Sequence, residues 1–184
     1  MIKLLYILLT IVIFLVFCII VANIYHTKFQ FSISKIKQAE KEIDTLLQRK
    51  LELMKEVAPQ IKKELNLTKF LDSLNTIEEK NFNNIELNDF LALKYRKILQ
   101  KMEQNEKLYK SEDIVSLVNM LADHEVDLYA TIKFYNDTIV SYNQLIISFP
   151  SNIFALFFRY RKKEFYKQER HESFEILKEE KKDK

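Results

Sequence analysis

The chain has 184 residues, a net charge of +3 and no glycine. The absence of glycine excludes the glycine-rich phosphate loop and the dinucleotide-binding fingerprint, because both need glycine where the backbone approaches the ligand. The small net charge gives no support for nucleic-acid binding, which needs a clustered basic face. Only two prolines interrupt a sequence rich in Leu, Lys and Glu, which are good helix formers. We therefore predict an all-α protein.

The first element is an apolar run over residues 4–22 that carries no charged side chain. As a helix it spans about 28 Å, close to the thickness of the hydrocarbon core of a bilayer. A cleaved signal peptide is the alternative. The run is longer than the usual apolar region of such a peptide, and no convincing small-residue cleavage site follows it. We predict a membrane anchor over residues 1–26, with the span at 4–22.

The charges beside the span predict its orientation. Lys3 alone precedes the span, whereas four lysines follow it within about twenty residues. The positive-inside rule then places the rest of the chain in the cytoplasm. The opposite topology stays open, because Cys18 is the only cysteine and no disulfide pattern reports the compartment. The four lysines are Lys28, Lys35, Lys37 and Lys41.

An amphipathic helix is predicted from residue 27 onward. Its apolar residues recur at spacings of three and four, and we assign charged residues such as Lys50 to its solvent side. Pro59 should kink or restart this helix, and a helical pattern resumes over residues 67–77. Asn81 to Asn84 is predicted to form the first major turn. The apolar positions are Phe29, Ile33, Ile36, Ile43, Leu47, Met54, Ala58, Ile61 and Leu65.

Two further long helices are predicted, from about Asn88 to Glu106 and from Ser111 to Ser148. The second would be about 57 Å long, so the domain must be elongated. Phe149-Pro150 should end it. Its apolar seam has the alternating steps of four and three that are typical of coiled coils. The seam positions are Ile114, Val118, Leu121, Glu125, Leu128, Ile132, Tyr135, Ile139, Tyr142 and Ile146.

The end of the chain contains a short apolar segment over residues 153–158, which we expect to pack on the end of the bundle rather than on a membrane. Residues 159–184 mix both charges and are predicted to form a solvated helix or a disordered end. The fold class is therefore all-α: an N-terminal transmembrane helix followed by an elongated antiparallel helical bundle over residues 27–158 and a charged C-terminal tail.

Repeated Tyr-Asn pairs one heptad apart, followed by Phe-Pro-x-Asn, resemble the LemA family. Ile43-Asp44 and Gln48-Arg49-Lys50 are similar to the family's first-helix signature, although its usual Trp before the Ile-Asp pair is missing. The resemblance implies a single-pass bacterial membrane protein with an antiparallel helical bundle and no established reaction. The candidate structural or interaction motif is Tyr135, Asn136, Tyr142, Asn143, Phe149, Pro150 and Asn152.

The Tyr-Asn pairs have two interpretations. Tyr135 and Tyr142 lie on the apolar stripe, where their hydroxyls need a partner or a path to water. Asn136 and Asn143 lie at the edge of the seam, so their amides can bond a neighbouring helix and set its register, as polar residues do in coiled coils. A ligand or partner site is the alternative. We favour the structural interpretation.

Glu125 is a candidate buried charge, because it lies on the apolar seam. A buried carboxylate needs a cation or hydrogen-bond donors, and Lys94 or Arg96 on the second long helix could supply them. The chain has three histidines, but none follows a glutamate in the Glu-x-x-His pattern of di-metal bundles. We predict no catalytic residue, no cofactor and no metal site.

The predicted function is a structural or protein-interaction scaffold at the bacterial inner membrane, with another protein as partner and no enzymatic activity. We predict no nucleic-acid partner and no small-molecule substrate. A membrane-remodelling or lipid-binding module is the first alternative, based on the aromatic residues of 154–158 beside a basic segment. A ligand- or metal-sensing bundle is the second.

Overall fold

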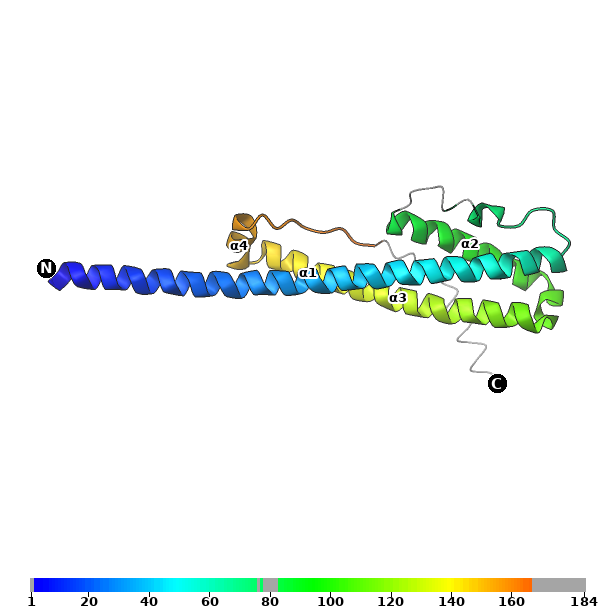
Figure 1. The fold of residues 1–184 in the computed structure, drawn as a ribbon, viewed down its shortest axis with the longest axis horizontal. Coiled ribbons are helices and arrows are strands. Elements are labelled where there is room, and N and C mark those ends of the chain that lie inside the picture. Colours follow the sequence, from blue (N-terminus) through cyan, green and yellow to red (C-terminus); the bar gives the residue numbers. More distant parts are fainter. Residues whose placement is uncertain (1, 76, 78–82, 167–184) are drawn as a thin grey trace.

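The computed structural model describes residues 2–75, 77 and 83–166. The described residues contain helices and no strand, which confirms the all-α prediction. Within the described ranges, four α-helices and two short 3-10 helices follow one another along an elongated molecule (Figure 1). Their bounds are α1 Ile2–Glu64, η1 Asp72–Leu74, α2 Asn84–Gln104, η2 Glu106–Lys110, α3 Glu112–Ile147 and α4 Ser151–Phe157.

A single helix, α1, contains both the apolar run and the amphipathic segment. Its 63 residues would extend about 95 Å at a rise of about 1.5 Å per residue. Pro59 lies inside α1 without ending it, so the predicted restart is wrong. A proline removes one intrahelical hydrogen bond, and the burial of Val57, Ala58 and Ile61 around it stabilises the last turns.

The first third of α1 is exposed along its length and is long and apolar enough to cross a membrane. Among the described residues, Phe29 is the first of α1 to be fully buried. The bundle therefore begins a few residues beyond the predicted end of the span at Ala22.

The core of the bundle lies between α1 and the antiparallel α3 (Figure 1). The ring of Phe29 meets that of Tyr142 at a centroid distance of 6.1 Å. Further along, His124 Nε2 lies 2.7 Å from the main-chain oxygen of Leu46. Nine of the ten predicted seam positions of α3 are buried, and Ile146 is half-buried. The periodicity of the sequence thus identified the inner face of this helix correctly.

Helix α2 packs on the part of the bundle furthest from the apolar run. It begins at Asn84, four residues before the predicted start, because Asn83 and Glu86 form a capping box. The helix predicted over residues 67–77 is absent from the described residues there, where only η1 forms. Asn66 and Leu71 both have positive φ, which ends helical geometry in this connection.

Helix α3 begins directly after Ser111, as predicted, and ends before the Phe149-Pro150 pair. The short helix α4 follows and turns back onto α1, where Phe154 stacks on Tyr25. Phe154 thus packs on the end of the bundle as expected, whereas Leu156 and Phe157 of the same segment are exposed. Residues 160–166 then run as an extended segment along the bundle (Figure 1). We call them the strap.

The strap differs from the solvated helix or disordered end that was predicted for this part of the tail. Tyr166 is buried, and Tyr160 and Lys163 are half-buried. Residues 167–184 lie outside the described residues. The α1–α3 pair is therefore covered by α2 at one end and by the strap nearer the apolar run.

Candidate functional site

The candidate site is the groove between α1 and α3 that holds the strap. Aromatic side chains fix the two ends of the strap. The ring of Tyr160 stacks on Phe29 of α1 at 4.5 Å, and Gln30 Nε2 donates a hydrogen bond of 3.0 Å to the Tyr160 hydroxyl. The ring of Tyr166 meets Tyr135 of α3 edge-on at 5.0 Å. The strap therefore contacts both long helices.

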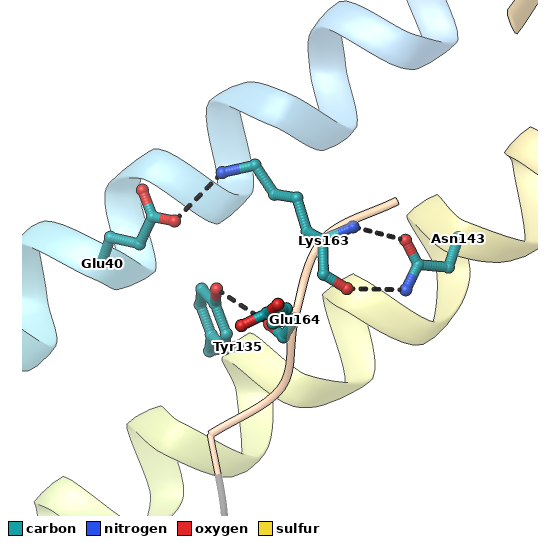
Figure 2. A network of polar contacts seen from close by, with 5 residues as sticks. All are labelled: Glu40, Tyr135, Asn143, Lys163 and Glu164. Atoms are coloured by element: carbon teal, nitrogen blue, oxygen red, sulfur yellow. Dashed lines mark hydrogen bonds and ion pairs between the residues drawn. The ribbon is translucent and has the colours of Figure 1, made fainter. Parts of the chain in front are cut away.

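Two asparagines of α3 hold the main chain of the strap between these ends. Asn143 Nδ2 donates to the Lys163 carbonyl, and Asn143 Oδ1 accepts from the Lys163 N–H, both at 2.9 Å (Figure 2). Asn136 makes the same pair of bonds with Tyr166, both at 3.0 Å. Each amide thus satisfies the donor and the acceptor of one residue, and we call these pairs the asparagine clamps.

The spacing of the asparagine clamps selects an extended chain. Asn136 and Asn143 are one heptad apart, which corresponds to about 10.5 Å along a helix. Lys163 and Tyr166 are three residues apart, which corresponds to about 10 Å in an extended chain. A bound helix would already use its own N–H and C=O groups. The two clamps therefore match an extended main chain and make no bond to its side chains.

The tyrosine hydroxyls of the groove act as neutral groups. Tyr135 donates a hydrogen bond of 3.3 Å to the Glu164 carbonyl (Figure 2). Burial, with a smaller effect from Glu40, raises the pKa of Tyr135 to about 12. Burial likewise raises the pKa of Tyr166 to about 12 and that of Tyr142 above its usual value. These groups are hydrogen-bond donors near neutral pH.

One ion pair joins a side chain of the strap to α1. Lys163 Nζ lies 3.1 Å from Glu40 Oε1, with each side chain about one third exposed (Figure 2). Glu40 interrupts the apolar stripe of α1 in the sequence, and this contact accounts for its place at the edge of the groove. Exposed pairs contribute little to stability, so the aromatic and clamp contacts dominate the binding of the strap.

A second polar feature, away from the strap, is the buried ion pair between Lys50 and Glu125. Lys50 is fully buried and Glu125 is 4% exposed. The cation bonded to Glu125 is thus Lys50 of α1, where Lys94 or Arg96 of α2 had been suggested. The placement of Lys50 on the solvent side is wrong. Lys50 lies on the same helical stripe as Leu47 and its apolar neighbours, and this spacing was the overlooked signal.

Burial governs the chemistry of this pair. Desolvation lowers the pKa of Lys50, while the carboxylate of Glu125 acts in the opposite direction. The Lys50 Nζ also lies 5.7 Å from the ring centroid of Tyr95 on α2. Glu125 Oε2 is buried and has no hydrogen-bond partner among the described residues. The pair joins α1 to α3 inside the core of the bundle.

The structure separates the predicted motif into two places. Tyr135, Asn136, Tyr142 and Asn143 line the groove, and the two asparagines bond the strap rather than a neighbouring helix. Phe149 and Pro150 lie in the turn between α3 and α4, and Asn152 lies in the first turn of α4. The strap itself was not predicted from the sequence, although two tyrosines within a charged tail were an available signal.

No metal site is apparent in the part of the chain that the structure describes, where no three His, Cys, Asp or Glu residues are grouped. His124 Nε2 lies within hydrogen-bond distance of the main-chain oxygen of Leu46.

Comparison with models of protein families gives a match to the LemA family over residues 79–177. The match covers more than half of the chain and includes α2, α3, α4 and the strap. No curated protein and no solved structure matches the chain.

Proposed function

The chain belongs to the LemA family, and on this premise we propose that it is a membrane-anchored, non-catalytic scaffold that binds an extended segment of another protein in the groove between α1 and α3. The asparagine clamps are the observation that carries the proposal. They bond N–H and C=O groups, which every polypeptide has except at proline. The groove therefore accepts segments of differing sequence.

The strap is the resident occupant of this groove. It is tethered to α4, so its local concentration at the groove is high, and a competing segment has to overcome that advantage. A partner in the same membrane meets this condition more easily than a dilute soluble protein. Aromatic side chains six residues apart, as in Tyr160 and Tyr166, would let a partner segment fill the same two aromatic contacts.

The location of the groove supports a partner at the membrane. Tyr160 meets α1 at Phe29, only seven residues after the predicted end of the span at Ala22. We place the anchor in the bacterial inner membrane with the bundle in the cytoplasm, because lysines are concentrated after the span.

Photo-crosslinking of the full-length chain in its native membrane tests this proposal. A photoreactive phenylalanine at Val140 lies on the same helical face as the asparagine clamps, because Val140 is four residues after Asn136 and three before Asn143. The matched control carries the same group at Phe134, an exposed residue of α3 on a different face. We expect a discrete protein adduct from Val140 and none from Phe134.

Two variants separate a binding groove from a purely structural one. Tyr166→Ser weakens the strap and should raise the yield of the adduct, because the resident competitor is lost. The double variant Asn136→Ala and Asn143→Ala removes both clamps and should lower the yield of the adduct. Equal yields at Val140 and Phe134, or a yield that falls in both variants, would contradict the proposal.

A further inference from the structure

The turn before α4 and α4 itself expose a group of large apolar side chains. Phe149, Leu156 and Phe157 are 81%, 82% and 79% exposed, and Ile147 and Ile153 are also exposed. Residues 145–158 contain no charged side chain. We call these five residues the α4 patch. Apolar groups gathered at one place on a surface mark a contact with another apolar body.

The α4 patch lies at the level where the apolar run of α1 ends. Phe154 stacks on Tyr25 at 5.1 Å, and Phe158 meets His26 at 5.0 Å. Tyr25 is three residues beyond Ala22, which corresponds to about 4.5 Å of helix. Figure 1 shows α4 beside α1, where the unaccompanied N-terminal part of that helix begins. The patch is thus at the depth of lipid headgroups if the run spans a bilayer.

The register of α3 gives the same depth independently. Tyr142 meets Phe29, and the two helices are antiparallel, so Ile147 lies about level with residue 24. The end of α3 therefore reaches the edge of the predicted span before the chain enters the turn at Phe149. Two separate contacts place the α4 patch beside the membrane surface.

The charges around the patch fit the same location. Arg159, Arg161 and Lys162 are exposed and directly follow α4, and Lys28 lies one turn beyond the level of Tyr25 on α1. Apolar side chains followed by basic ones are typical of segments that lie in the interface of a bilayer with anionic lipids. The patch also lies level with the end of the exposed apolar run of α1, so a protein partner bound there would have to contact lipid at its edge.

We propose that the α4 patch inserts into the headgroup and upper acyl region of the same leaflet from which α1 emerges, as a second membrane contact of this chain. The inference rests on the proposed membrane anchor and is independent of the groove. With two membrane contacts, the bundle is held at one height relative to the bilayer and in one rotational position about the axis of α1. Because the strap begins directly after α4, the bilayer also positions the segment that fills the groove.

The test uses fluorescence of the full-length chain in bilayer nanodiscs of phosphatidylethanolamine and phosphatidylglycerol, with one chain per disc. The sequence contains no tryptophan, so each substitution introduces a single reporter. Phe157→Trp reports the α4 patch, Phe14→Trp reports the span, and Phe134→Trp reports the surface of the bundle, where Phe134 is 48% exposed. Leu156→Trp is a second reporter of the patch.

We expect lipids with brominated acyl chains to quench Phe157→Trp and Leu156→Trp severalfold more than Phe134→Trp, with emission shifted to the blue. Quenching of Phe14→Trp without quenching at either patch position would overturn the second contact and leave the anchor intact. Absence of quenching at all positions would overturn both. Blue-shifted emission at the patch without quenching would show that protein covers α4, which also overturns the proposal.

Discussion

Lys50 of α1 and Glu125 of α3 form an ion pair inside the core of the bundle. Both side chains lie on apolar stripes, and neither has access to bulk water. Removal of one partner from such a pair leaves an uncompensated charge, whereas replacement of both by apolar side chains is often neutral. The pair therefore couples the two longest helices at one position along their length.

The first prediction concerns this coupling. Lys50→Met should lower the free energy of unfolding by about 3–5 kcal/mol, because Glu125 is then buried without its cation. The double variant with Glu125→Leu should recover most of that loss. Denaturant unfolding of the full chain in detergent, followed by circular dichroism, measures both. Arg49→Ala is the control, since its ion pair with Glu52 is exposed. A double variant no more stable than Lys50→Met would refute the explanation.

The second prediction concerns the asparagine clamps. Asn143→Ala removes two hydrogen bonds to the strap, so amide hydrogen exchange at Lys163 should accelerate. Each lost bond corresponds to about 1 kcal/mol of local stability. Asn143→Asp should keep the bond accepted from the Lys163 N–H and lose the donated one. Asn152→Ala, at an exposed asparagine of α4, should leave this exchange unchanged. Unaltered protection in Asn143→Ala would show that the clamp does not hold the strap.

The third prediction concerns alkaline pH. Burial raises the pKa of Tyr135 and Tyr166 from 10.0 to about 12. The folded state therefore retains these protons longer than the unfolded state. Their stabilising effect is complete below pH 10 and is lost as the pH rises towards 12. Titration of tyrosinate absorbance, with protease cleavage of the strap as a second readout, should show release of the strap in this window.

The control for that titration is the double variant Tyr135→Phe and Tyr166→Phe, which has no proton to lose at either position. Its strap should remain resistant to protease through the same pH range. Equal alkaline sensitivity of the variant and the natural chain would assign the effect to other groups.

The fourth prediction contrasts two helix starts. The Asn83 side chain accepts from the Glu86 N–H at 2.9 Å, and Glu86 accepts from the Asn83 N–H at 3.2 Å. Asn83→Ala should cost about 1 kcal/mol of stability. Ser111 precedes α3 but makes no capping bond through its side chain, so Ser111→Ala should cost much less. Denaturant unfolding followed by circular dichroism measures the loss of stability in each variant. An equal loss in Asn83→Ala and Ser111→Ala would contradict this prediction.

The amino-acid sequence was sufficient for the features that belong to a single element. The apolar run of α1 is visible in composition, and the inner face of α3 is visible in the spacing of residues such as Leu121 and Ile132. Glu125 was recognised as buried for the same reason. The spacing of apolar residues indicates which side of a helix faces inward, because that spacing follows the turns of the one helix and depends on no other part of the chain.

The choice of partners required the folded chain. The antiparallel register brought Lys50 to Glu125, and the turn back at α4 placed Phe154 beside Tyr25. The same reversal carried residues 160–166 into the groove, where Asn136 and Asn143 bond them. The hydrogen bonds among these contacts join positions separated by 20 to 75 residues in the chain. Their geometry depends on how whole helices align, and no repeat within one segment contains that information.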